Sequence, residues 1–569
     1  MTRSARLPVV LLWHMHQPQY RDALTGEYVL PWTYLHAIKD YIDMAAHLEA
    51  QPTAKAVVNF TPVLIEQLQE ISARIQDHLT TGSPLPDPVL ALLGPDPLSR
   101  VPSERLAAVR ACLRAQRKQM IERFGPYLEL SSLAETLGTP ERIGYASNQF
   151  IHDLAVWYHL AWLGETVRRS SAQIASLTEQ GRAFTPEQRR ELLVLIGDLM
   201  ASIIPRFRRL QERGQVELSV TPYGHPIIPL LQDFSTAREA IPNIPLPKHA
   251  KYPGGGERAA WHVEESLRVF QEAFGVRPKG VWPSEGAISE DTLALFDRAG
   301  FQWAASSSNV LRGSLAATPD DAQAANNENA YNRPYRLPGA RLNCFFRDDT
   351  ISDLIGFSYA TWHGDDAARN LSMEIEKLAT RYASDASHAV LIALDGENAW
   401  EHYPFNGYYF LRAMYAALAE SPHIELMTLS ECLARGVEPT PLPRVVTGSW
   451  VHGTLATWMG DPDKNTAWDL LCEAKLAFDE VKKAGVLGEE QKRAAERQLA
   501  LCESSDWFWW FGDYNPHDAV DQFDRLYRRQ LVTLYRLLKV QPPENLTRPI
   551  SIGQGAPEQG GVMRRAFAS

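Results

Sequence analysis

Short apolar runs alternate with helical patterns along most of the chain. The run Val390–Leu394 is apolar at every position, which is typical of a strand buried on both faces of a parallel sheet. Strands separated by helices predict a parallel α/β architecture, either a barrel or a doubly wound sheet. The predicted strands are Val9–Trp13, Ala56–Phe60, Val216–Thr221, Gly280–Trp282, Gln302–Ala305, Leu342–Phe346, Val390–Leu394 and Ile424–Met427.

The longest stretch without a predicted strand, residues 62–213, has helical periodicity. Its last helix begins with a capping box at Thr185–Gln188, with proline at the first helical position. Apolar residues then recur every three or four positions from Leu192 to Ile203, and Gly214 marks the end. We therefore expect a helical insertion after the second strand of a domain that spans residues 1–430.

The pattern changes after residue 430, where helices are predicted at Glu489–Cys502 and Ala519–Val540 and no further strand is predicted. This indicates a C-terminal helical domain over residues 431–545. The last segment, 551–569, is rich in glycine, with glutamine, proline and alanine, a composition that predicts a disordered tail.

Charge and cysteine usage narrow the class of protein. The net charge of −11 over 569 residues argues against a nucleic-acid partner and fits a neutral substrate. Five cysteines show no CxxC or Cys/His cluster, so we expect reduced thiols, a reducing compartment and no structural zinc. The apolar stretch Leu7–Trp13 reads as a strand rather than a signal peptide, and no run reaches the length of a membrane span. A cytoplasmic protein without a membrane partner is predicted.

Polar residues follow several predicted strands at the end where parallel barrels place their active sites. His14 and His16 project to one side of the segment after the first strand. Glu285 lies just past the strand that ends at Trp282, and Asp395 ends the most apolar strand of the chain. Two converging carboxyl groups are the usual catalytic equipment of glycoside hydrolysis. One alternative is that Asp395 only caps the next helix. The other is that it acts as a catalytic acid, because burial would raise its pKa and let it carry a proton near neutral pH.

Further candidates carry weaker signals. Glu217 lies on the polar face of its strand, where a carboxylate is either paired or faces a cavity. His225 follows in the next loop. Trp458 and Asp461 stand in a loop marked by glycine and proline, as in a sugar subsite, whereas most of the aromatic run 507–511 reads as core.

Taken together, these segments resemble the five ordered motifs of glycoside hydrolase family 57. The resemblance covers residues 9 to about 515, and its motifs are His14–Pro18, Gly214–Glu217 with His225-Pro226, Gly280–Glu285, Leu394–Glu397 and Ala456–Asp461 through Trp468. It implies an incomplete (β/α)7 barrel with a C-terminal α-helical bundle that contributes to the site, Glu285 as nucleophile, Asp395 as acid/base, and no cofactor or metal. The expected substrate-binding residues are His14, His16, Glu217, His225, Trp282, Glu397, Trp458, Asp461 and Trp468.

The third motif, Trp282–Gly286, looks most like that of the amylopullulanase and α-amylase branch. The resemblance thus implies retaining hydrolysis of α-glucosidic linkages in glycogen, starch or maltodextrin. A 4-α-glucanotransferase with the same carboxyl pair is the main alternative, and linkage preference and oligomeric state stay open. A metal-dependent α-mannosidase or deacetylase using His14, His16 and Asp395 is a remote alternative, since the first motif has no aspartate. A glucan-binding protein without activity is disfavoured because both carboxyl groups are present.

Overall fold

The computed structural model describes residues 6–318 and 324–555, and its centre is a barrel of seven parallel strands. The strands follow one another around the barrel in the order β7-β5-β4-β3-β2-β1-β8, and β8 returns to β7 through Leu391 and Arg347. This closure confirms the predicted barrel and excludes the doubly wound alternative. The barrel strands are β1 (Leu7–Met15), β2 (Ala56–Phe60), β3 (Val216–Val220), β4 (Gly280–Val281), β5 (Trp303–Ser307), β7 (Asn343–Arg347) and β8 (Val390–Asp395).

Three short strands extend the sheet outside the barrel. β9 (Ile424–Leu426) pairs with β1, and β6 (Tyr335–Arg336) runs antiparallel to β7. β10 (Thr440–Pro441) pairs with β6, so the region predicted to be purely helical after residue 430 also contains a strand. That strand was not foreseen because two residues carry no alternating pattern.

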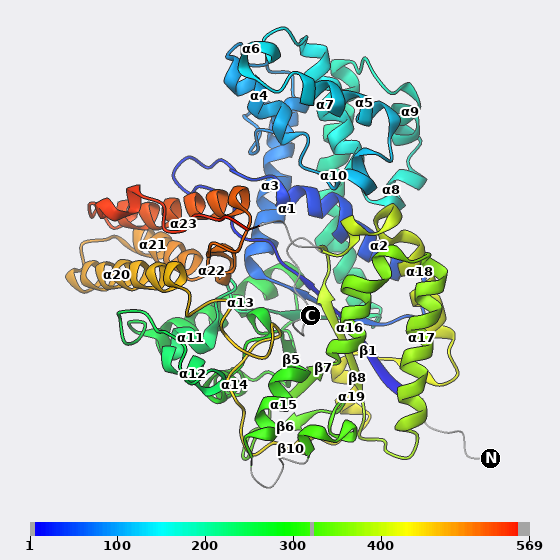
Figure 1. Ribbon diagram of the computed structural model, residues 1–569, viewed down its shortest axis with the longest axis vertical. Coiled ribbons are helices and arrows are strands. Elements are labelled where there is room, and N and C mark those ends of the chain that lie inside the picture. The colour runs from blue at the N-terminus through cyan, green and yellow to red at the C-terminus, as the bar shows by residue number, and fades with distance from the viewer. Residues whose placement is uncertain (1–5, 319–323, 556–569) are drawn as a thin grey trace.

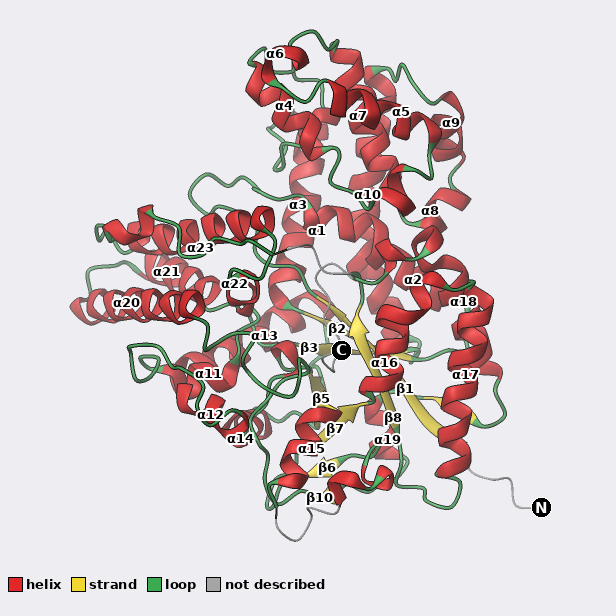
Figure 2. Ribbon diagram, viewed as in Figure 1, coloured by secondary structure: helices red, strands yellow, loops and turns green. Residues whose placement is uncertain are grey.

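Helices surround the barrel and connect its strands (Figures 1 and 2). They are α1 (Trp32–His36), α2 (Ile42–Ala50), α11 (Ile228–Gln232), α12 (Ala237–Ala240), α13 (Gly255–Phe274), α14 (Glu290–Arg298), α15 (Ser308–Ala316), α16 (Asp349–Asp353), α17 (Gly364–Arg381), α18 (Tyr408–Glu420) and α19 (Leu429–Ala434). The barrel interior is itself filled by side chains, with Trp282 and Trp303 wholly buried among aliphatic residues of β1, β2 and β8. The interior therefore holds a packed core, as in other parallel barrels.

The helical insertion stands above the barrel in Figure 1 and is carried by its two longest helices. Thr185 and Gln188 form the predicted capping box of the second one. The insertion consists of α3 (Pro62–Thr81), α4 (Pro102–Ala111), α5 (Gly125–Thr136), α6 (Pro140–Ile143), α7 (Asn148–Ala161), α8 (Glu165–Ser170), α9 (Ala172–Gln180) and α10 (Pro186–Glu212).

The C-terminal helices pack beside the barrel and are anchored to it by buried charges (Figure 1). Glu503 has no exposed surface and accepts hydrogen bonds from Arg258 and Tyr252, while the His262 ring nitrogen lies 2.7 Å from it. Because α13 supplies Arg258 and His262, this network fixes the turn after α21 to the barrel. The helices are α20 (Pro462–Ala484), α21 (Glu489–Cys502), α22 (Ser505–Trp510) and α23 (His517–Leu537).

The first residues of the predicted disordered tail are ordered, which corrects that prediction for 551–555. Ser551 is buried, donates to Asp463 Oδ2 at 2.8 Å and accepts from the Gly512 amide at 2.9 Å. Gly555 lies so close to the Tyr514 carbonyl that a side chain would not fit, so the glycines serve close packing here rather than flexibility. Residues 556–569 lie outside the described residues. Among the described helices, none has the length and apolarity needed to cross a bilayer.

Candidate active site

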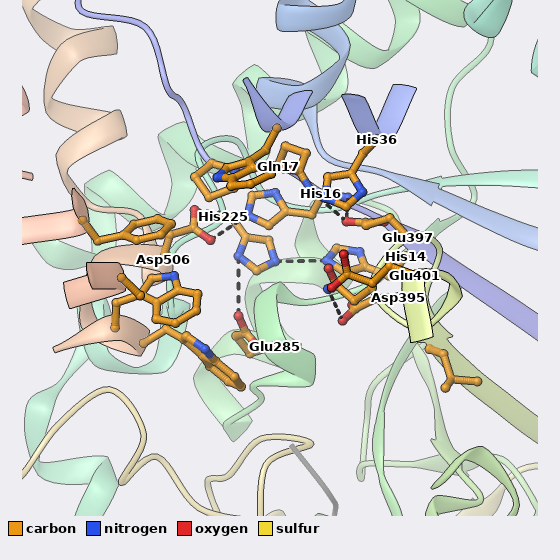
Figure 3. Close-up of a pocket in the computed structure, with 18 of the residues that line it drawn as sticks. His14, His16, Gln17, His36, His225, Glu285, Asp395, Glu397, Glu401 and Asp506 are labelled. Carbon is orange, nitrogen blue, oxygen red and sulfur yellow. Dashed lines mark hydrogen bonds and ion pairs between the residues drawn. The ribbon is translucent and has the colours of Figure 1, made fainter. Parts of the chain in front are cut away.

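A cavity of about 480 Å³ opens at the carboxyl end of the barrel strands. The ends of β1 and β8 and the loops after β3 and β4 deliver polar side chains to it, and Asp506 of α22 lies on one side (Figure 3). The residues that meet there from distant parts of the chain are His14, His16, His225, Glu285, Asp395, Glu397, Trp450 and Asp506. The sequence-predicted carboxyl pair and histidines therefore line one cavity.

Glu285 is held in a strained position. Its backbone φ is +57°, and that of His225 is +59°, a left-handed conformation that costs energy for residues other than glycine and concentrates at functional sites. Trp450 donates its indole N–H to Glu285 Oε2 at 2.9 Å, and the Ser505 hydroxyl lies 3.4 Å from Oε1. Burial raises the pKa of Glu285 to about 8; the Trp450 hydrogen bond opposes this shift, and the Asp395 and Asp506 carboxylates add to it.

Asp395 ends β8 directly beside His14 of β1 in the sheet. Its carboxylate accepts a hydrogen bond from the Asn398 amide at 2.8 Å. Burial raises its pKa, as expected for a carboxyl at the end of a buried strand, while Asn398, His16 and Arg347 limit the shift. Glu285 and Asp395 are thus two buried carboxyl groups with raised pKa values, and the Asp395 carboxylate adds to the rise at Glu285.

The three histidines form a stack beside Glu285 and Asp395 (Figure 3). The rings of His16 and His225 lie 3.9 Å apart at an angle of 14°, and His14 Nε2 is 3.2 Å from His225 Nε2. Burial lowers the pKa of His14 to about 3 and that of His225 well below its usual value, so both imidazoles are neutral. His16 Nε2 lies 2.9 Å from Asp506, and its Nδ1 lies 3.1 Å from Thr61 Oγ1.

His16, His225 and Asp506 are close enough together to be considered as metal ligands. A histidine binds a metal through a lone pair in the plane of its ring. With two rings stacked face to face at 3.9 Å, those lone pairs run side by side and do not converge on one point. Both nitrogens of each ring also have hydrogen-bonding partners. The arrangement fits a hydrogen-bonded stack better than a metal centre.

Glu397 also lines the cavity and is 2% exposed. Its Oε1 accepts from the His16 amide and the Gln17 side chain, both at 3.3 Å, whereas Oε2 makes no hydrogen bond to the described residues. Burial raises its pKa well above the usual range, with the nearby Asp395 and Asp40 adding to the shift. A buried carboxyl oxygen without a partner is uncommon in proteins, which marks Glu397 as a candidate functional residue.

Glu217 does not line the cavity, which corrects its expected position. It faces the barrel interior as Ser219 does, but it lies two residues earlier on β3, about 6–7 Å nearer the opposite end of the barrel. There its carboxylate accepts from the Trp303 indole at 2.7 Å and from the Ser430 hydroxyl and amide. The sequence predicted correctly that Glu217 lies on the polar face of its strand. It did not predict how far along the barrel axis Glu217 lies from the cavity.

The tryptophans and the aspartate expected from the third and fifth motifs do not line the cavity. Trp282 packs against Trp450 and His14 from within the barrel. Trp458 and Trp468 are wholly buried, with the Trp468 indole donating to the Trp458 carbonyl. Asp461 caps the first turn of α20.

The sequence interpretation missed Asp506 and did not say which members of the aromatic run, most of which it expected to be core, reach the cavity. Asp506, Trp509 and Trp510 line the cavity, whereas Trp507, Phe508 and Phe511 are core. Positions 506, 509 and 510 follow helical spacing and share one face of α22. If the run is treated as an amphipathic helix, its polar face carries one carboxylate and two indoles. That pattern would have predicted this wall of the cavity. The helical insertion adds Trp162 and Arg114 on another side.

Comparison with known proteins agrees with this geometry. The sequence profile described as glycosyl hydrolase family 57 matches residues 10–443. A family 57 branching enzyme from Thermococcus kodakaraensis is 15% identical, with a TM-score of 0.57 over 94% of this chain and 90% of that one. The corresponding enzyme from Pyrococcus horikoshii is 16% identical, with a TM-score of 0.56 over 99% of this chain and all of that one.

An α-amylase from Thermotoga maritima is 13% identical, with a TM-score of 0.55 over 95% of each chain. At these identities the structures establish a shared fold, and the profile match, which covers most of the chain, establishes the family. The chain belongs to glycosyl hydrolase family 57 and is a glycoside hydrolase.

Proposed function

We propose that this enzyme cleaves α-glucosidic linkages of glycogen, starch or maltodextrin with retention of configuration, using Glu285 as nucleophile and Asp395 as general acid/base. The observation that carries the proposal is the shared cavity. It brings together two buried carboxyl groups whose pKa values are both raised, and the Trp450 N–H opposes this rise at Glu285. An indole N–H can only donate, so it favours the ionised form of Glu285 over the protonated one.

The proposed reaction has two steps. Glu285 attacks the anomeric carbon while Asp395 gives its proton to the glycosidic oxygen, and the bond between that oxygen and the anomeric carbon breaks. The departing glucan leaves with a free hydroxyl. Water then gives a proton to Asp395 as its oxygen attacks the anomeric carbon, which releases Glu285 as a carboxylate. Transfer differs only in that a sugar hydroxyl replaces the water, so a 4-α-glucanotransferase is the alternative outcome of the same chemistry.

The cavity wall supports a neutral sugar substrate. Trp32, Trp162, Trp509 and Trp510 line it together with several carboxylates, a combination suited to stacking on sugar rings and accepting their hydroxyl protons. The names of the structural neighbours, branching enzyme and α-amylase, support an α-glucan. We further propose hydrolysis of the amylopullulanase or α-amylase kind and a cytoplasmic location, the latter supported by five buried free cysteines.

Product analysis with one defined maltooligosaccharide tests the reaction. Only shorter sugars would identify a hydrolase, longer and shorter sugars together a transferase, and cleavage of pullulan would add α-1,6 linkages. Azide added to Glu285→Ala and Asp395→Ala variants assigns the two carboxyl groups separately. A β-glycosyl azide is expected from the first and an α-glycosyl azide from the second, because azide replaces the nucleophile in one case and water in the other. The reverse pattern would exchange the two roles, and full activity of both variants would refute the proposal.

A further inference from the structure

A row of buried polar side chains leads from the barrel interior to Glu285. His14 Nδ1 lies 2.7 Å from the Asn59 amide, His14 Nε2 lies 3.2 Å from His225 Nε2, and His225 Nδ1 lies 2.8 Å from the Ser505 hydroxyl. The same hydroxyl is 3.4 Å from Glu285 Oε1. All four residues are at most 3% exposed. Asn59 and His14 are direct neighbours in the sheet, and α22 supplies Ser505.

We propose that this row is a one-directional hydrogen-bond relay, in which each group donates to the next and the Ser505 hydroxyl donates to Glu285 Oε1. The proposal rests on the proposed role of Glu285 as nucleophile. It makes Ser505 a positioning residue, contributed to the barrel site by the C-terminal helices.

Only two directions are open to such a row. The two histidines are neutral, so each has one N–H donor and one lone pair. If His225 receives a proton from Ser505, the single hydroxyl proton is used there and none is left for Glu285. If His225 donates to Ser505 instead, that hydroxyl is free to donate to Glu285. His14 must then donate to His225, and Asn59 must donate to His14.

Thr221 favours the second direction. Its hydroxyl lies 2.8 Å from the Trp282 carbonyl and 2.8 Å from the same amide atom of Asn59 that faces His14. The carbonyl can only accept, so a Thr221 proton given to Trp282 leaves the Thr221 oxygen to accept from Asn59. Asn59 then presents its amino group to both Thr221 and His14. A half-turn of the amide exchanges its two atoms at no steric cost.

After this half-turn the Asn59 amide oxygen also has a hydrogen-bond donor, on the side of Ser219. Ser219, 3.1 Å away, then donates its hydroxyl to the amide oxygen. In the opposite direction Thr221 donates to Asn59, so the Trp282 carbonyl receives no hydrogen bond from it. Ser505 donates to His225, so Glu285 Oε1 receives none from Ser505. The forward direction therefore satisfies more buried groups, and buried polar groups without partners are costly.

The relay favours a negative charge on Glu285, whereas neighbouring carboxylates disfavour it. The Asp395 and Asp506 carboxylates both disfavour a negative charge there, while the neutral His225 Nδ1 lies 3.9 Å from Oε1. With Trp450 on Oε2 and Ser505 on Oε1, each carboxylate oxygen receives one donor. The relay thus helps to keep the attacking group ionised in a buried site.

Histidine tautomers test the direction without any assay of activity. In ¹⁵N-histidine-labelled protein, the relay requires the proton on Nε2 of His14 and on Nδ1 of His225. His14→Gln and His225→Gln variants identify the two resonances by their loss. The opposite pair of tautomers, Nδ1 protonated in His14 and Nε2 in His225, would overturn the proposal.

The pH dependence of kcat/KM gives a second test, with Ser505→Ala compared against Ser505→Thr. Loss of the donor should move the acid limb to higher pH by roughly half a unit to one unit, and threonine should restore it. Ser306→Ala is the matched control, because this buried hydroxyl donates to the Gly286 carbonyl in the same turn without touching the carboxylate. An unmoved limb in Ser505→Ala would refute the relay. A wild-type protein inactive on every glucan would instead refute the proposed function.

Discussion

Trp450 is joined to Glu285 twice: its indole donates to Oε2 at 2.9 Å, and its backbone amide donates to the Glu285 carbonyl at 3.0 Å. Trp450 belongs to the segment between β10 and α20, which also pairs with the barrel at Ile288 and Gly448. The segment that leads into the C-terminal helices therefore fixes both the carboxylate and the strained backbone of Glu285. The barrel alone would not build this site.

Replacing Trp450 by phenylalanine should weaken catalysis strongly. A hydrogen bond to a charged group contributes about 1.5–3 kcal/mol, so kcat/KM should fall roughly 10- to 150-fold. Loss of the N–H donor should also raise the pKa of Glu285, which moves the acid limb of the profile to higher pH. Trp458→Phe is the control, because that buried indole makes no hydrogen bond through Nε1 to the described residues. Equal losses in both variants would assign the effect to packing.

Asp395→Asn should abolish the alkaline limb of the pH profile. The acid must carry its proton at the start of the reaction, so the rate falls as pH rises through its pKa, and burial raises that pKa. Removing the acid should cost roughly 10²- to 10⁴-fold with a glucan, and much less with a glucosyl fluoride, whose leaving group needs no proton. If the alkaline limb keeps its position in the variant, another group sets it.

The carboxyl groups of Glu285 and Asp395 should lie about 5–6 Å apart, as in retaining enzymes. A crystal structure with a covalent or transition-state-like inhibitor measures this separation directly. A distance of about 9 Å in that complex would indicate an inverting enzyme with room for water between the two groups.

Periodicity predicted the frame of this site well. All eight predicted strands are present, and Ala56–Phe60 and Glu489–Cys502 match β2 and α21 residue for residue. Continuous apolar runs predict buried strands, and a capping box predicts a helix start. Both signals are local, and the tertiary packing of this protein agrees with them. The carboxyl ends of the strands then placed His14, Glu285 and Asp395 in one cavity, because parallel strands bring those ends to one edge.

Contacts between distant segments were beyond the reach of local patterns. Alternation along β3 assigns Glu217 to the barrel interior but not to a depth, which depends on register with β2. Asp506 reaches the site from α22, and Glu503, three residues earlier, is held by Arg258 of α13. Trp458 and Trp468 were expected to face sugar, yet the tight packing of α20 buries them. Each position depends on how distant segments of the chain pack together, which local sequence patterns do not encode.

The Glu503 anchor makes a prediction about stability and pH. Burial alone would raise its pKa, but Arg258 and His262 lower it to about 2, below the ordinary value of 4.5. A carboxyl with a depressed folded-state pKa stabilises the fold above its ordinary pKa, and the contribution is lost as pH falls toward 2. The shift corresponds to about 3 kcal/mol. Wild-type stability should therefore fall between about pH 5 and pH 2, as measured by urea unfolding.

Glu503→Gln should remove that part of the pH dependence and lower stability at neutral pH. The variant leaves Arg258 buried without its carboxylate, which typically costs about 3–5 kcal/mol. Because the same turn carries Ser505 and Asp506, activity should fall at temperatures where the protein is still folded. Glu489→Gln, at the exposed start of α21, controls for loss of one negative charge on the same helix. If both variants unfold at the same urea concentration as wild type, the buried ion pair does not anchor the helices to the barrel.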